Sequence, residues 1–185
     1  PLITEPQQLE EAFVPKNTFE EVTAQVIEDL INAKDLLPPN RPDRQFGYAT
    51  QGAALGLLAR VQLYNKNFSG ENGVLDATSQ LMGLGYALHT DYTELFTLAG
   101  ETSPEIVFSV RFDRDPNNSN QEDFSATFLG SPKVDQRPMP NLVNSYYCTD
   151  GLPITESPLF NPNNEKENRD PRADASIYFP DDLFL

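Results

Sequence analysis

With 185 residues the chain can bury one sizeable hydrophobic core, and 38% hydrophobic against 22% charged residues exclude an intrinsically disordered protein. Its net charge of −15 argues against binding to nucleic acid or to an anionic bilayer, since like charges repel. Sixteen prolines predict that helices alternate with long irregular connections. We therefore expect a single domain over residues 1–185 that binds neither nucleic acid nor an anionic membrane surface.

Cys148 is the sole cysteine, so the chain can form no internal disulfide and no cysteine-based zinc site. No apolar stretch approaches the roughly 20 residues that cross a bilayer, and no basic-then-apolar signal opens the chain. The first residue is Pro1 rather than a methionine, which favours an interior piece of a longer protein. A leader or lipid anchor would then lie outside this chain.

The first predicted helix has both a start and a stop signal. Residues 1–17 are polar and contain several prolines, and we expect an irregular lead-in strap there. Thr18 and Glu21 have the spacing of a capping box, which predicts a helix start. One face then carries apolar residues at helical spacing: Val22, Val26, Leu30, Ala33 and Leu37. Pro38 and Pro39 end the helix because neither can donate a backbone hydrogen bond.

Two more helices follow. The second is predicted from about Thr50 to Lys66 and the third from Val74 to Leu84, with Gly85 in position to end it. Asp91 should cap a short turn further on. Helix pairs joined by short turns over 18–100 indicate tetratricopeptide-like hairpins, although the tryptophan of that repeat is absent. The predicted fold class is mostly α, with such hairpins, long irregular loops and a minor short-strand element.

The second half of the sequence is less periodic. Residues 101–112 predict a short strand because Ile106, Phe108, Val110 and Phe112 alternate with other side chains. Residues 113–140 are rich in Asn, Asp, Ser and Gln and predict a variable loop. Residues 141–185 should hold a short helix over 141–147, a turn at Asp150-Gly151 and a loop-rich tail.

Searches for catalytic motifs fail. His89 is the sole histidine, there is no G-x-S-x-G motif, and no glycine-rich phosphate loop is present. Asp113, Asp115 and Asn117 fit the start of a calcium loop, but later positions hold Asn118 and Phe124 instead of Gly and Glu. That excludes an EF-hand and leaves an irregular calcium site open. We assign no catalytic residue, no metal ligand and no cofactor.

Several segments, taken in order, resemble the SusD/RagB family. Asp29 to Lys34 with Leu37-Pro38 is similar to the family's D-L-x-x-A and L-P helix, and Ala49 to Tyr64 is similar to its hallmark helix. The later motifs are found in Gly85-Tyr86-Ala87-Leu88, Asp91-Tyr92, Leu95-Phe96, Ser103 to Phe108, Leu142-Val143 with Tyr146, Asp150-Gly151 and Asn168 to Arg172. The resemblance covers Leu2 to Arg172 and identifies the chain as a central segment of such a protein.

The resemblance implies a helical scaffold and a nutrient-binding protein rather than an enzyme. Members of the family are lipid-anchored proteins on the surface of the outer membrane. They capture glycans or other nutrients and cover a SusC-like, TonB-dependent transporter. By the same resemblance, the hallmark helix and the Asn168 to Arg172 motif are expected to hold the fold, the latter by pinning loops through arginine–carboxylate contacts.

Ligand binding in the family tends to involve variable loops, which points here to the region 113–137. Aromatic rings stack on sugar rings, while amide and guanidinium groups bind hydroxyls, so the expected ligand-binding residues are Asn118, Gln121, Phe124, Phe128 and Arg137. The absence of Trp leaves a peptide or another nutrient open as ligand. Two alternatives also stay open: a helical interaction scaffold without direct ligand binding, and a glycoside hydrolase using two of the 28 acidic residues.

Overall fold

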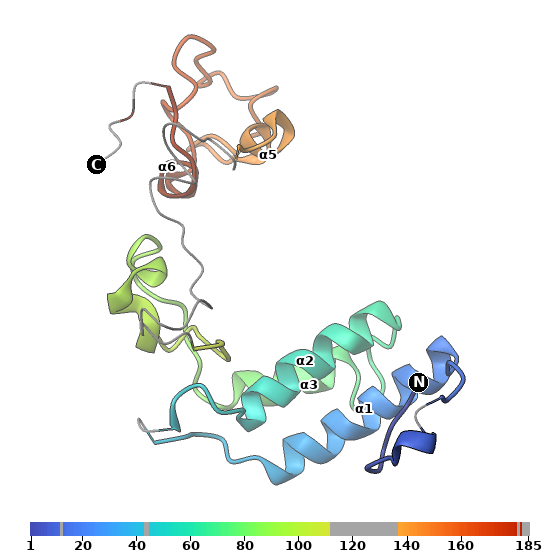
Figure 1. The fold of residues 1–185 in the computed structure, drawn as a ribbon. Helices are drawn as coiled ribbons and strands as arrows, with labels where there is room; N and C mark the ends of the chain where they lie inside the picture. The colour runs from blue at the N-terminus through green and yellow to red at the C-terminus, as the bar shows by residue number, and fades with distance from the viewer. Residues whose placement is uncertain (12, 43–44, 112–136, 181, 183–185) are drawn as a thin grey trace. The chain divides into compact units, whose positions relative to one another are not determined.

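The computed structural model describes residues 1–11, 13–42, 45–111, 137–180 and 182 (Figure 1). The chain divides into two compact units. Unit 1 comprises Pro1–His89 and Thr102–Arg111, and unit 2 comprises Thr90–Glu101 and Phe112–Leu185. In the described ranges, no helix combines the length and the apolar character needed to cross a membrane.

Unit 1 contains three α-helices preceded by the short 3-10 helix η1 (Leu9–Glu11). They are α1 (Phe19–Leu36), α2 (Gln51–Tyr64) and α3 (Val74–Met82). Helix α2 packs against both α1 and α3, so it forms the middle of the group (Figure 1). All three predicted helices are confirmed, and α3 ends at Met82, earlier than expected, with Gly83 at its C-cap.

The capping box predicted for α1 is present. The Thr18 hydroxyl accepts from the Glu21 amide at 3.2 Å, and the Glu21 carboxylate accepts from the Thr18 amide at 2.9 Å. This backbone hydrogen bond from Thr18, followed by one from the Asn17 side chain, holds the pKa of Glu21 below its ordinary value. Thr50 likewise caps α2 by accepting from the Ala53 amide. Local sequence signals therefore set where both helices begin.

The core of unit 1 lies where α2 meets its neighbours. Leu55 and Leu58 are fully buried, and Ala59 and Ala77 complete the cluster. The half-buried side chains packed around it come from α1 and from α3 with its C-terminal turn: Ile27, Leu30, Ile31, Leu81 and Leu84. Small residues allow this close packing. A side chain at Gly52 would overlap the Tyr86 ring, so two of the family-like motifs meet there.

Residues 102–111 return to unit 1 without forming the expected strand. The described residues 106–111 have no β-ladder partner, and a lone strand has nothing to satisfy its backbone groups. Their side chains pack individually instead: Val107 lies near Gly56 of α2, and the Arg111 guanidinium lies 4.1 Å from the centre of the Phe46 ring. The strand prediction is therefore corrected to an irregular segment across these residues.

Unit 2 is built from short elements. Among its described residues these are η3 (Glu94–Phe96), α5 (Pro140–Ser145) and α6 (Pro171–Ser176), and η4 (Leu98–Thr102) begins in the same unit. Asp91 caps η3 by accepting from the amides of Thr93 and Glu94, as predicted. The tail was expected to be loop-like throughout, which misses α6. Across the described residues the chain is mostly helical with almost no strand, so the predicted fold class is confirmed.

Candidate ligand-binding site

The framework of the site is a pair of crossing segments in unit 2. Cys148 and Arg169 form an isolated antiparallel β-bridge. On either side of it the Thr149 amide donates to the Asn168 carbonyl at 2.8 Å and the Asp170 amide donates to the Tyr147 carbonyl at 2.8 Å. These backbone bonds bring the residues after α5 next to the start of α6, although more than a dozen residues separate them in the sequence.

Arg169 fastens this framework from inside. Its side chain is buried, with 5% of the residue exposed. Nη2 donates to the carbonyls of Val143 and Tyr146 at the end of α5, and Nη1 donates to the Glu165 carbonyl. The guanidinium thereby satisfies carbonyls that the end of a helix leaves without partners. The expected pinning role of this motif is found, but at Arg169 the partners are carbonyls rather than carboxylates.

A tight turn fixes the other side of the framework. Gly151 has φ +80, which glycine adopts without a steric penalty, as the Asp150-Gly151 turn predicted. The two carboxylate oxygens of Asp150 accept from the Leu152 amide at 3.1 Å and from the Ser157 hydroxyl at 2.7 Å. Asn168 also has a positive φ, and its side-chain amide donates to the Leu159 carbonyl. These contacts hold the loop between the two segments in place.

An open cavity of about 790 Å³ lies over this framework. Its walls combine aromatic side chains, small polar residues and one ion pair: Tyr92, Ser145, Tyr146, Tyr147, Cys148, Thr149, Gly151, Asp170, Pro171 and Arg172. Tyr92 and Tyr147 are 41% and 52% exposed, so ring surface is available to a ligand. Tyr92 is also oriented by an edge-to-face contact with Phe96, 5.1 Å between ring centres.

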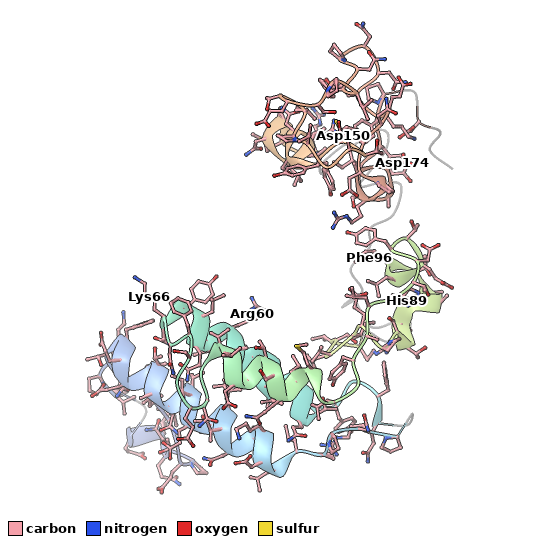
Figure 2. All side chains as sticks on the ribbon, turned by 180° about the vertical axis from the view of Figure 1, so that it is seen from behind. Arg60, Lys66, His89, Phe96, Asp150 and Asp174 are labelled. Atoms are coloured by element: carbon pink, nitrogen blue, oxygen red, sulfur yellow. The ribbon has the colours of Figure 1, made fainter. Side chains whose placement is uncertain are left out.

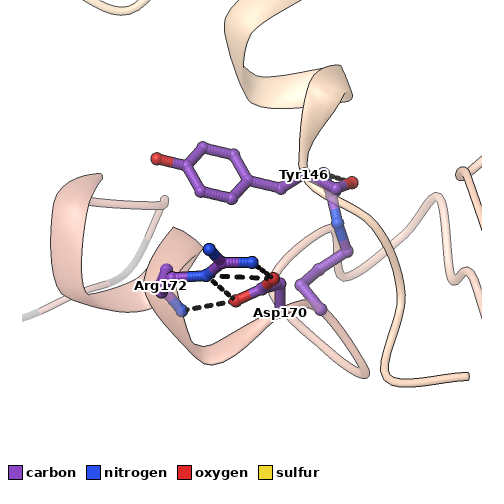
Figure 3. Close-up of polar contacts among 4 residues, drawn as sticks. Tyr146, Asp170 and Arg172 are labelled. Carbon is purple, nitrogen blue, oxygen red and sulfur yellow. Dashed lines mark hydrogen bonds and ion pairs between the residues drawn. The ribbon is translucent and has the colours of Figure 1, made fainter. Parts of the chain in front are cut away.

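The ion pair in the wall is formed by Asp170 and Arg172. The Arg172 Nε donates to both carboxylate oxygens at 2.9 and 3.2 Å, and Nη2 donates to Oδ2 at 2.5 Å. The Arg172 side-chain hydrogen bonds, followed by that of its backbone amide, lower the pKa of Asp170 to about 2. Figure 3 shows the pair beside the ring of Tyr146. The carboxylate is thus ionised and fully engaged at neutral pH.

Such a surface suits a hydroxylated ligand. Tyrosine rings offer flat apolar faces with a hydroxyl at the edge, and the Thr149 side chain adds a small polar group. A second cavity, of about 500 Å³, lies in unit 1 between α1 and α2. It is lined mainly by Leu, Ala, Val and Phe, and Arg60 (Figure 2) is the one charged residue of its wall. Its apolar lining gives hydroxyl groups few partners, so the cavity in unit 2 is the better candidate.

The structure describes one of the five residues that the sequence predicts to bind ligand. Asn118, Gln121, Phe124 and Phe128 fall outside the described residues, and so do the aspartates of the calcium-like pattern. Arg137 is described and is exposed shortly before α5. Within the described ranges, no cluster of three or more His, Cys, Asp or Glu side chains could hold a metal ion.

Sequence reasoning missed the cavity itself. The sequence predicted a fold role for the Asn168 to Arg172 motif and predicted ligand contact for none of the residues that line the cavity. Two features of the sequence could have indicated the cavity. Tyr146-Tyr147 lies close to the Asp150-Gly151 turn, and Arg172 is part of the Asn168 to Arg172 motif. What the sequence could not supply was the pairing of the two segments, which brings these residues to one surface.

Comparisons with known proteins connect this geometry to a family. Residues 104–185 match the model of the SusD family. A SusD-like protein from Bacteroides fragilis has a similar fold, with a TM-score of 0.74 and 25% sequence identity, over 94% of this chain and 37% of that one. No protein with a curated description matches the chain. The predicted resemblance to the SusD/RagB family is confirmed, directly over residues 104–185 and in fold across nearly the whole chain.

The matched region contains all of the cavity wall except Tyr92. The SusD family is known for binding rather than catalysis, which agrees with a site made of rings, hydroxyls and a saturated ion pair. This chain spans 37% of the length of the solved relative, so it corresponds to part of such a protein.

Proposed function

We propose that this chain is part of a protein that captures a nutrient, an oligosaccharide, at the bacterial cell surface without chemically changing it. The observation that carries the proposal is that the SusD family match over residues 104–185 includes the cavity around Tyr146, Tyr147 and the Asp170–Arg172 pair. Aromatic faces can stack on sugar rings while the neighbouring polar groups bind hydroxyls.

The site extends beyond the cavity in this proposal. Asn118, Gln121, Phe124, Phe128 and Arg137 contribute further ligand contacts from the variable loop, and residues 1–185 are one segment of a single SusD/RagB-like domain. The full-length protein is lipid-anchored at the outer membrane and exposed on the cell surface. It delivers the captured sugar to a SusC-like, TonB-dependent transporter. Similarity to the SusD family supports the place at the cell surface and the role in uptake, while the loop contacts rest on the side-chain chemistry of those residues.

Titration calorimetry with a panel of oligosaccharides tests the proposal. Binding without turnover is expected, and Tyr146→Ala with Tyr147→Ala should weaken it at least tenfold, because about 1–3 kcal/mol is typical for loss of a stacked ring. Tyr64→Ala is the matched control, since Tyr64 is 84% exposed in unit 1 and outside the cavity. Sugar cleavage, or no binding to any member of the panel, would contradict the proposal.

The loop contribution needs its own experiment. Phe124→Ala combined with Phe128→Ala should weaken sugar binding further if the loop contacts the ligand. Unchanged affinity with an intact fold, judged by circular dichroism, would remove the loop from the site and leave the cavity as the proposed centre.

A second candidate function is a helical interaction scaffold without direct ligand binding in this segment. The apolar cavity between α1 and α2 favours it, together with the half-exposed Leu57 and Phe108 in its wall. Apolar concave surfaces of this kind receive protein side chains more readily than sugars. The scaffold would be favoured if the chain bound the SusC-like transporter tightly in the absence of any glycan. Leu57→Asp should then abolish this binding, and Tyr147→Ala should not.

A further inference from the structure

We infer that the unit 2 cavity selects uncharged sugars over acidic ones, and that Asp170 sets this selectivity by occupying the guanidinium of Arg172. The inference rests on the proposed function, because it concerns which sugars the cavity would accept. It depends on three features of the wall: its charged groups, the geometry of their contact and the donors that stay available.

Among the described residues of the cavity wall, only Asp170 and Arg172 are charged. An arginine by itself would favour an acidic ligand, because its planar fork matches the two oxygens of a carboxylate. Here one edge of the fork is already filled. Nε and Nη2, which form that edge of the guanidinium, both donate to Asp170. An incoming uronate would have to displace a carboxylate that belongs to the protein or use the other edge of a guanidinium whose charge Asp170 already balances.

That displacement is opposed by the anchoring of Asp170. Its carboxylate also accepts from the Arg172 backbone amide at 2.9 Å, as the N-cap of α6. The Asp170 side chain is 19% exposed, whereas the Arg172 side chain is 62% exposed. The carboxylate is therefore the fixed member of the pair and holds the guanidinium against the wall. The pair adds no net charge, and the chain as a whole carries −15, so the long-range field also repels an anion.

The cavity wall still offers hydrogen-bond donors to the uncharged groups of a ligand. Nη1 of Arg172 has no hydrogen-bond partner among the described residues, and neither do the hydroxyls of Tyr147 and Thr149. Sugar hydroxyls can accept from Nη1 and can both donate to and accept from the hydroxyl groups. The wall is thus equipped for neutral hydroxylated rings, and the one cation among its described residues is already paired with Asp170.

The test compares a neutral hexose oligosaccharide with the uronic acid oligosaccharide of the same linkage and length by calorimetry. The wild-type chain should bind the neutral sugar at least about tenfold more tightly than the uronate. Asp170→Asn should raise the ratio of uronate to neutral affinity by about tenfold, because it frees a guanidinium edge while an asparagine can still cap α6. High salt should reduce the increase in uronate affinity that Asp170→Asn causes, and it should leave the affinity for the neutral sugar unchanged.

Asp174→Asn is the matched control. It removes the same charge from the same helix, but Asp174 contacts Lys166 rather than Arg172 and does not line the cavity. The control should leave the affinity ratio within about twofold of wild type. A ratio raised equally by both substitutions would overturn the inference, because overall charge rather than the filled fork would then set selectivity.

Two further outcomes separate this inference from the proposed function. Wild-type binding of the uronate as tight as that of the neutral sugar overturns the selectivity and leaves sugar capture intact. Failure of every variant to bind any sugar overturns sugar capture, and the selectivity with it. If Asp170→Asn does not fold, Arg172→Gln decides the question: it should lower the uronate-to-neutral ratio further, and an unchanged or higher ratio overturns the inference.

Discussion

Each of the two units is stabilised internally by a different kind of contact. In unit 1 a cluster of aliphatic side chains, centred on Leu55 and Leu58, packs three helices together. In unit 2 the described residues include polar side chains that reach backbone groups far along the sequence, above all Arg169. The difference shows that a SusD-like fold combines a region specified by local helix signals with one specified by long-range hydrogen bonds.

Helix length explains the difference. Helix α1 has 18 residues and α2 has 14, whereas α5 and α6 have six each. Isolated helices shorter than about 12–15 residues are marginal in water, so short ones depend on tertiary contacts. Unit 2 supplies those contacts with Arg169 at the end of α5 and Asp170 at the start of α6.

The strongest test of the apolar half of this comparison is Leu58→Ala. Leu58 is fully buried, and its truncation should lower the free energy of unfolding by about 3 kcal/mol through lost burial and a residual cavity. Urea unfolding followed by circular dichroism measures the loss. Leu57→Ala is the control, since that neighbour is 49% exposed and should cost about 1 kcal/mol or less. Equal costs would mean that α2 is not packed as described.

Arg169→Met tests the polar half. It leaves the carbonyls of Val143, Tyr146 and Glu165 without their donor, and we expect a loss of about 2 kcal/mol localised to unit 2. Hydrogen exchange should show faster exchange in peptides covering α5 and the 147–149 and 168–170 segments, with α1 to α3 unchanged. Arg169→Lys should recover part of the protection because it restores one charged donor. Equal loosening of unit 1 would contradict the separation of the two units.

The weakest of the stability tests concerns local signals in unit 1. Thr18→Ala removes the acceptor for the Glu21 amide and should cost about 1 kcal/mol, mainly as fraying of the first turn of α1. Thr18→Ser keeps the hydroxyl and should behave like wild type. Hydrogen exchange of the Glu21 amide is the readout. No change in Thr18→Ala would show that the packing of α1 on α2, rather than its cap, fixes the start of the helix.

The same contrast explains what the sequence could predict. The helices of unit 1 follow from signals within a few residues, such as the Thr18–Glu21 box and the prolines after Leu37, and they were predicted with nearly correct ends. The strand over 101–112 was wrong across its described residues because alternation predicts a strand only if a partner exists, and a partner is not a local property.

The candidate site was harder to predict for a related reason. Tyr146 and Arg172 share a cavity because the Thr149 and Asp170 amides bond across the chain, and sequence spacing does not encode such a pairing. Helix α6 was missed because a proline such as Pro171 is typical of loops. Proline is also favoured in the first turn of a helix, here after the N-cap residue Asp170. The loop residues proposed to bind ligand, including Phe124 and Phe128, stay predictions.

The last prediction concerns the acid sensitivity of unit 2. The pKa of Asp170 is lowered from 3.8 to about 2 by its hydrogen bonds from Arg172, so the folded state favours the ionised carboxylate. The resulting stabilisation is complete above the unfolded pKa and is lost as the pH falls through the folded one. The stability difference between wild type and Asp170→Asn should therefore be constant above about pH 5 and shrink between pH 4 and pH 2. Hydrogen exchange in α6 peptides at stepped pH measures it. A difference that persists unchanged at pH 2 would show that the cap of α6, which asparagine partly retains, rather than the ion pair, distinguishes the two proteins.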